Sequence, residues 1–434
     1  MSTKKNLIKF LAICFVSFVS VNSLMAQLKM SAEFRPRAEL RHGYKSLDTD
    51  ADKSAFSITQ RMRLNVGYTM DKLKFGVSLQ DVRVWGDVPQ QNTTSSATNQ
   101  LMLHTGWAEH SFTNALSVKI GRQELNYDDA RILGNADWAQ QARAHDLVLF
   151  KYEKDFKLHI GAAFNQDAEK MKGTDYALAD LTKNYKTMQF AWFNKKVNDL
   201  NVSVLILNNG MQNKSTDATP VYKIAYSQTV GTRLVYDKGA NSVAGAFYST
   251  MGKDITLRKM SAYYASLAIT NNITDNWGAG LGWELLSGTS QVDKKNANYT
   301  NKSFSPLYGT AHKFNGAMDY FYVGNHANSV GLNDLYASIT YKKGKFNAGI
   351  TPHYFQAASD VIDPSVAGGT MAKGLGTEID LYAGYKLSDN TQVSGGYSQM
   401  FGTKTLQQLN GGGDYKATNN WAWLMITFKP EFLK

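Results

Sequence analysis

The stretch from residue 28 to residue 41 constrains the fold more than any other feature, because its side chains alternate strictly in polarity. The even positions carry apolar side chains: Leu28, Met30, Ala32, Phe34, Pro36, Ala38 and Leu40. The odd positions carry six charged side chains and a serine: Lys29, Ser31, Glu33, Arg35, Arg37, Glu39 and Arg41. Successive side chains of a strand point to opposite faces, so this strand needs lipid on one face and water on the other. The rest of the chain repeats the pattern, which predicts an all-β protein, a transmembrane antiparallel β-barrel.

The N-terminus has the features of a secretory signal. A basic stretch precedes an apolar stretch at 10–21, and Ala26 offers a cleavage point. The apolar stretch is too short for a spanning helix, which disfavours the alternative of a retained anchor. We therefore expect a signal peptide at 1–26 and a single barrel domain at 27–434.

The one cysteine, Cys14, lies inside this apolar stretch. The bulky Ile13 before it makes a lipoprotein signal a poor match. The mature chain would contain no cysteine and would need neither disulfides nor thiol chemistry.

Composition supports a barrel. The 434 residues include 35 Gly, 23 Tyr, 21 Phe and 8 Trp but only 7 Pro, and mean hydropathy is −0.35. No stretch of 18 apolar residues follows the signal, which argues against transmembrane helices.

Cleavage of the signal would remove three lysines and no acid, lowering the formal net charge from +11 to +8. Because the chain is secreted, nucleic acid is an unsuitable partner for its positive charge. The cationic side chains recur on the polar faces of the strands, so we expect them in the lumen.

Eighteen segments alternate in polarity and are expected to be strands. They cover residues 28–44, 56–70, 73–85, 101–112, 116–125, 145–152, 156–165, 185–195, 200–207, 221–236, 241–251, 260–270, 277–287, 332–341, 345–355, 376–387, 391–401 and 419–429. Short turns alternate with longer connections at 45–55, 86–100, 126–144, 166–184, 208–220, 252–259, 288–331, 356–375 and 402–418. This order predicts about 18 strands with short periplasmic turns and long extracellular loops. A sandwich or a propeller would not sort its connections in this way.

Aromatic side chains near strand ends are expected at the two membrane interfaces. They are Tyr68, Phe75, Trp192, Tyr236, Trp277 and Tyr341. The last strand carries an apolar face that ends at Phe428, and such a terminal strand is a signal for the barrel assembly machinery, which we expect as a partner. Six residues follow Phe428, so the signal is not in its simplest form.

Motifs for catalysis or cofactors are absent from the sequence. There is no Gly-x-Ser-x-Gly, His-Glu-x-x-His or phosphate loop, and the eight histidines lack metal-ligand spacing. The run Gly278-Ala279-Gly280-Leu281-Gly282 has the wrong spacing for a dinucleotide and lies in a strand. We expect no cofactor, no metal and no enzymatic activity, although a barrel enzyme can assemble a dyad from distant strands.

The most distinctive segment runs from Gly121 to Asp146 and ends as a polar loop of mixed charge. One interpretation is a loop folded inward as a constriction, and the alternative is a surface loop held by its own ion pairs. Arginine pairs with carboxylates and tryptophan stacks on sugar faces, so the content suits an acidic saccharide. The constriction candidates are Glu124, Asp128, Asp129, Asp137 and Trp138.

This segment, the polar first strand and the run Leu79–Gly86 resemble the alginate export family of outer-membrane porins. The run Leu307–Phe314, followed by Gly316–Tyr320, is similar to a long loop in members of that family. The resemblance covers most of the mature chain. It implies a monomeric barrel of eighteen strands that passes a uronate polymer through an arginine-rich pore.

By this resemblance, eight arginines would mark the solute pathway. They are Arg35, Arg37, Arg61, Arg63, Arg83, Arg122, Arg131 and Arg143. Alternation points most of them inward, but Arg83 and Arg122 break the parity and require a bulge. Two features depart from the family. The longest short turn, Asn271–Asn276, cannot plug a pore, and acidic residues are also expected in the lumen: Glu33, Glu39, Glu109, Glu124, Glu284, Glu378 and Asp380.

Three functions remain open at this point. The first is a passive outer-membrane channel of a Gram-negative bacterium for anionic saccharides or small organic anions, with outer-membrane lipid as its surroundings. The second is a binding or structural barrel whose pore is closed by loop 288–331. The third is a barrel-embedded hydrolase.

Overall fold

The computed structural model describes residues 28–91, 101–175, 184–215 and 221–433. The expected signal peptide at 1–26, with Cys14, lies outside these residues.

Nineteen strand segments form one antiparallel sheet. They are β1 (Leu28–His42), β2 (Ala55–Met70), β3 (Leu73–Val84), β4 (Met102–Ser111), β5 (Leu116–Gln123), β6 (His145–Glu153), β7 (Lys157–Phe164), β8 (Thr187–Val197), β9 (Leu200–Lys214), β10 (Tyr222–Lys238), β11 (Asn241–Lys253), β12 (Lys259–Asn272), β13 (Trp277–Leu286), β14 (Leu332–Lys343), β15 (Phe346–Gln356), β16 (Gly374–Ser388), β17 (Thr391–Gly402), β18 (Asn419–Phe428) and β19 (Glu431–Leu433). The short helices are η2 (Asp293–Lys295), η3 (Ala311–Lys313), η4 (Val323–Asn325) and α3 (Lys404–Asn410).

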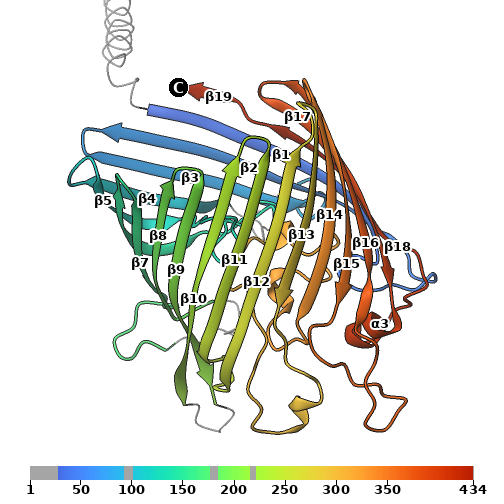
Figure 1. Cartoon of the computed structure of the whole chain (residues 1–434). Helices are drawn as coiled ribbons and strands as arrows, with labels where there is room; N and C mark the ends of the chain where they lie inside the picture. Colours follow the sequence, from blue (N-terminus) through green and yellow to red (C-terminus); the bar gives the residue numbers. More distant parts are fainter. Residues whose placement is uncertain (1–27, 92–100, 176–183, 216–220, 434) are drawn as a thin grey trace, which may run out of the picture.

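The sheet closes on itself at β1 (Figure 1). One edge of β1 pairs with β2, and the other pairs first with β18, where Ala38 faces Leu424, and then with β19, where Met30 faces Leu433. Since β18 and β19 extend the same seam, the barrel has eighteen strands, and the predicted fold class is confirmed. The largest difference in a strand boundary is in β9, which runs on to Lys214 and pairs with β10 beyond residue 207.

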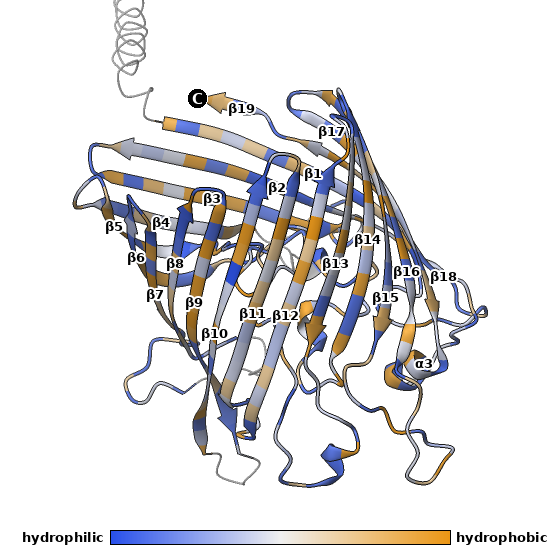
Figure 2. Ribbon diagram, viewed as in Figure 1, coloured by the Kyte–Doolittle hydropathy of each residue, from blue (hydrophilic) through white to orange (hydrophobic). Residues whose placement is uncertain are grey.

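The two faces of the barrel follow the sequence alternation, and Figure 2 shows apolar and polar residues alternating along many strands. Large apolar side chains such as Phe56, Leu281 and Leu424 are exposed on the outer face. At the short-turn end the rings of Trp277 and Tyr341 lie 4.7 Å apart on that face, as expected for a membrane interface. Within the described ranges, no helix has the length and apolarity needed to cross a membrane.

Some inward aromatic rings lie flat against the wall because the facing residue is glycine. A Cβ built on Gly282 would approach the Tyr336 ring to 2.1 Å, and one built on Gly396 would meet Trp423 at 2.4 Å. The rings therefore cover the neighbouring strand instead of projecting into the lumen. This arrangement keeps side-chain bulk out of the centre of the barrel.

Two long connections turn into the barrel (Figure 1). The first inward loop (residues 124–144) joins β5 to β6, and the second inward loop (residues 303–331) belongs to the connection from β13 to β14. Both contain fully buried apolar residues, including Leu133, Phe304 and Met318. The barrel interior therefore holds an apolar core beneath the loops and is only partly a water-filled lumen.

Candidate functional site: two inward loops that constrict the lumen

The two inward loops are joined by their backbones. Leu133 and Tyr308 form a parallel bridge, in which the Tyr308 N–H donates to Ile132 O at 3.1 Å and the Gly134 N–H donates to Tyr308 O at 2.9 Å. The Thr310 N–H donates to Ala130 O at 2.8 Å. These bonds make one unit of the two loops.

The first inward loop holds an unusual backbone. Four of its residues other than glycine have positive φ: Asp128 (54°), Ala130 (68°), Ala136 (50°) and Ala142 (53°). Such conformations cost on the order of 1 kcal/mol each and persist only where surrounding contacts hold them. The contacts below supply that constraint.

Arginines of β1 and β2 hold one side of the first inward loop. Arg35 Nη2 donates to Asp137 O at 2.8 Å, Arg37 Nη1 donates to Trp138 O at 2.9 Å, and Arg61 Nη2 lies 2.9 Å from Asp137 Oδ1. The Arg61 side chain is fully buried and also pairs with Glu33. Burial alone would raise the pKa of Asp137, but the Arg61 and Arg35 guanidinium groups lower it below its usual value.

Glutamines and Arg63 extend this anchor. Gln80 Nε2 donates to Gln141 O at 3.0 Å, and Arg63 Nη2 donates to Gln80 Oε1 at 2.8 Å. Arg63 also lies 3.7 Å from Glu124, which contacts His104 at 2.7 Å and accepts a hydrogen bond from Asn135 Nδ2 at 2.9 Å. Glu124 therefore ties the start of the loop to β2 and β4.

The opposite side of the first inward loop packs on an apolar inner wall. Leu125, Ile132 and Leu133 belong to one buried cluster with inward residues of β8 and β9. Those wall residues are Met188, Phe190, Trp192, Leu205 and Leu207. The prediction that Trp192 lies at a membrane interface is wrong. It faces inward because its strand presents apolar residues to both sides, and its ring lies 4.8 Å from that of Tyr127.

The adjacent aspartates of this loop bind different walls. Trp192 Nε1 donates to Asp128 Oδ1 at 3.2 Å, and burial raises the pKa of Asp128. Arg233 Nε donates to Asp129 Oδ2 at 2.9 Å, and Lys313 Nζ donates to Asp129 O at 2.6 Å. The charged residues of the loop thus pair mainly with the barrel and the second loop instead of with one another.

Arg131 links both loops to β13. Its Nη2 lies 2.9 Å from Glu284 Oε2 and donates to Asn315 Oδ1 at 2.9 Å. The second loop then reaches β16, where the Met318 N–H donates to Glu378 Oε1 at 2.7 Å. Together the loops are anchored from β1 to β16, so the distinctive segment lies inside the barrel and is not a surface loop.

Two of the eight arginines do not face the lumen. The pairing of β2 with β3 continues without a shift, so Arg83 shares the outer face with Asp81, its partner at 2.5 Å. Arg122 likewise lies on the outer face, 2.8 Å from Asp146. The inward orientation that we expected for these two residues is wrong, because the bulges that it requires in β3 and β5 are absent.

Trp138 cannot offer its ring to a sugar. The Arg37 guanidinium lies 4.1 Å from the ring centroid, and His312 stacks on the ring at 4.3 Å with an interplanar angle of 15°. The rings of Trp423 and Trp421 also lie 5.0 and 5.9 Å from that of Trp138, so Trp138 acts as part of the loop packing. The expectation that it stacks on a saccharide is therefore wrong.

A cavity of about 670 Å³ opens on the long-loop side of the constriction. Its lining includes Arg37, Arg41, Lys45, Arg143 and Tyr322, and it also extends to Arg83 at the long-loop end of β3. We call it the outer vestibule. It is the space that a solute from the long-loop side would enter first.

Arg143 differs from the other seven arginines in the charge around it. Each of those seven has a carboxylate partner within ion-pair distance. Arg143 has none among the residues that the structure describes, and its Nη1 donates to Gly309 O at 2.8 Å. Burial lowers the pKa of Arg143, but a guanidinium remains protonated at neutral pH. Its charge is thus available to the outer vestibule, a distinction that strand alternation could not reveal.

A metal centre finds no support in the described part of the chain, where no group of three or more His, Cys, Asp or Glu side chains is arranged to hold an ion.

A closed ring of eighteen antiparallel strands, with short turns at one end and long loops at the other, is the fold of outer-membrane porins. Among solved structures, the chain is similar to OccK9 (OpdG) of Pseudomonas aeruginosa, with 11% identity over 94% of this chain and 100% of that one, at a TM-score of 0.60. It is also similar to OccAB4 of Acinetobacter baumannii, with 12% identity over 94% and 99% and a TM-score of 0.61. The structure of Pseudomonas aeruginosa OpdK with vanillate matches with 11% identity over 93% and 99%, at a TM-score of 0.59.

Identities this low establish the fold alone. No protein-family model and no curated protein matches the chain. Membership of the alginate export family therefore remains a prediction from sequence motifs.

Proposed function

We propose that the protein is a monomeric outer-membrane channel through which small organic anions, including acidic saccharides, diffuse passively. The observation that carries the proposal is the uncompensated Arg143 guanidinium at the outer vestibule. An unpaired cation in a confined space concentrates anions there, and diffusion down a gradient needs only weak sites.

The remaining charges of the outer vestibule are partly balanced, which suits transient binding. Arg41 pairs with Glu39 at 2.7 Å, and Lys45 lies 4.0 Å from Asp319 and 4.7 Å from the Tyr322 ring centroid. A solute carboxylate would meet one strong cation and several compensated ones. It would bind and still be released, as conduction requires.

A single acidic unit fits this geometry better than a long polymer. The backbone bonds between Ile132–Gly134 and Tyr308 run across the lumen, so a polyuronate chain would have to displace them. Vanillate, the compound present with OpdK, is a small carboxylate of the size that the outer vestibule admits. Passage of alginate itself would require the loops to open.

The test is the reversal potential of the refolded protein in a planar bilayer under a KCl gradient. We expect anion selectivity that falls severalfold in Arg143→Met and is retained in Arg122→Met. The second variant is a matched control, since it removes the same charge from the outer face. Cation-selective current, or equal effects of the two substitutions, would contradict the proposal.

A barrel closed by its loops is the second candidate. It is favoured by the anchoring of the second inward loop, in which Met318 and Ala317 donate backbone N–H groups to Glu378 and Asp380. Absence of single-channel current over the accessible voltage range would select this candidate.

A further inference from the structure

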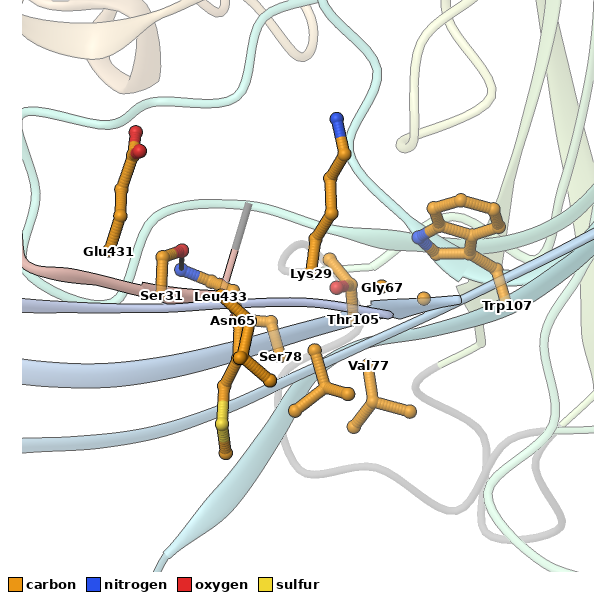
Figure 3. Close-up of a pocket in the computed structure, with 13 residues that line it drawn as sticks. Lys29, Ser31, Asn65, Gly67, Val77, Ser78, Thr105, Trp107, Glu431 and Leu433 are labelled. Atoms are coloured by element: carbon orange, nitrogen blue, oxygen red, sulfur yellow. Dashed lines mark hydrogen bonds between the residues drawn. The ribbon is translucent and has the colours of Figure 1, made fainter. Parts of the chain in front are cut away.

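A second cavity, of about 480 Å³, lies in the inner wall of β1–β4 near the short-turn end (Figure 3). Its floor is a pair of facing glycines, Gly67 and Gly76, with Lys29 and Trp107 at the two ends of the same row. A Cβ built on Gly67 would have one neighbour, Lys29 Cβ at 4.0 Å, whereas one built on Gly76 would meet the Trp107 ring at 2.4 Å, so the ring covers Gly76 and the open space lies over Gly67. The recess is therefore a real hollow, separate from the outer vestibule and on the other side of the constriction.

A row of neutral hydrogen-bonding side chains borders this floor. Ser31, Asn65, Ser78 and Thr105 follow one another across the four strands. Ser78 Oγ donates to Asn65 Oδ1 at 2.7 Å, and Asn65 Nδ2 donates to Ser31 Oγ at 3.5 Å. Hydroxyl and amide groups have more donor and acceptor positions than these bonds use, so the row can bind several hydroxyls of a solute.

Two ammonium groups flank the recess. Lys29 and Lys119 have no carboxylate within ion-pair distance in the described part of the chain, and Lys119 Nζ lies 3.8 Å from the Trp107 ring centroid. Glu431 of β19 lies at the opposite rim, facing Ser31, and Figure 3 shows it on the same side of the wall as Lys29 and Trp107. A bound carboxylate is therefore attracted toward the two lysines and away from Glu431.

We infer that this recess binds one polyhydroxylated carboxylate, a sugar acid, at the periplasmic side of the constriction. The inference rests on the proposed channel function and adds a substrate class to it. An aromatic acid without hydroxyls leaves the row of Ser31, Asn65, Ser78 and Thr105 without hydrogen bonds to the solute, whereas a neutral sugar leaves the two lysines without an anionic partner. Both shortfalls weaken binding, because a site built for hydrogen bonds rejects ligands that lack them.

The experiment measures binding of three probes to the full-length refolded protein in nanodiscs by calorimetry. The probes are D-glucuronate, D-glucose and benzoate. We expect glucuronate to bind best of the three probes. Its affinity should fall about tenfold or more in Lys29→Met, which removes a cation, and in Gly67→Val, which fills the hollow. Asn65→Leu should lower glucuronate affinity while leaving that of benzoate unchanged.

Thr340→Val serves as the control, because Thr340 faces inward on β14, outside the recess, and faces Gly278. It should bind glucuronate like the parent. The heat-dependent gel shift of a folded barrel checks that each variant is folded. Lys29→Met, which changes no backbone and fills no space, keeps the test decisive if Gly67→Val fails to fold.

Glucuronate affinity that is unchanged in folded Lys29→Met and Asn65→Leu overturns the inference. Equal affinities for benzoate and glucuronate also overturn it. The reversal potential of the same preparations separates the two proposals. If the parent protein is anion-selective but these substitutions do not change glucuronate affinity, the recess alone is refuted. If the parent protein is not anion-selective, the channel proposal is refuted.

Discussion

The inner walls of β1–β2 and of β8–β9 hold the same loop by different physical means. On β1 and β2, Arg35 and Arg61 bind Asp137 through charge-assisted hydrogen bonds. On β8 and β9, Met188 and Leu207 are fully buried in an apolar cluster with the loop. The first wall is expected to respond to salt and pH, and the second is not, because apolar burial carries no charge to screen.

This difference assigns distinct tasks to the two sides of the constriction. The apolar side fixes where the loop lies. The ionic side joins the loop to β1 and β2 through Arg35 and Arg61, which are buried in these contacts and compensated by Glu33 and Asp137.

The largest effect is expected from Arg61→Met. It removes the nearer of the two arginines that Glu33 and Asp137 share, and breaking a buried ion pair costs about 3–5 kcal/mol. We expect amides of residues 135–143 to lose most of their protection from hydrogen exchange while the barrel strands keep theirs. Unchanged protection at Asp137–Gln140 would show that the apolar side alone holds the loop.

Leu133→Ala comes next. Leu133 is 1% exposed, and truncation of a buried leucine costs about 2–5 kcal/mol. The loss of loop protection should be the same in 0.1 M and 1 M NaCl, in contrast to the ionic side. Leu281→Ala is the matched control, because Leu281 is 68% exposed on the outer face and should leave the loop unaffected. A strong salt dependence would refute the division between the two walls.

His326 gives the second inward loop a pH dependence of its own. Burial lowers the pKa of His326 to about 3, with the charge of Arg131 acting in the same direction. The folded state thus binds fewer protons than the unfolded one, so stability is full above the ordinary pKa near 6.5 and falls as pH drops toward 3.

Opening of residues 303–331 should therefore rise by up to about tenfold per pH unit below 6.5, measured by hydrogen exchange corrected for intrinsic rates. His326→Gln keeps a donor for Phe321 O and should abolish this slope. His110→Gln, a change at an exposed histidine, should retain it. An identical slope in His326→Gln would assign the effect to another group.

The smallest effect is expected from Arg83→Met. Arg83 and Asp81 form a partly exposed pair on the outer face, and such pairs contribute about 0–1 kcal/mol. Loop protection should not change, and the reversal potential should change less than in Arg143→Met, because Asp81 already compensates the Arg83 charge. A shift in selectivity as large as that of Arg143→Met would place Arg83 on the solute path and restore the original expectation for this residue.

Strand alternation was sufficient for the barrel but not for its interior. It predicted the number and order of the strands, and it placed Arg35 and Arg61 on the inner face of neighbouring strands. The inward placement of Arg83 and Arg122 was wrong because it replaced strict alternation with bulges that β3 and β5 do not contain. The buried wall of β9 did leave a signal, since Val204, Leu205, Ile206 and Leu207 are apolar on both faces.

The sequence by itself determined the barrel, because a side-chain period of two between lipid and water is a local property of each strand. The tertiary structure alone decided which charges are compensated. Arg131 pairs with Glu284, whereas Arg143 pairs with no carboxylate among the described residues, although both arginines lie in the same loop. Such pairing depends on residues far apart in the chain that meet only when the barrel closes around the two inward loops.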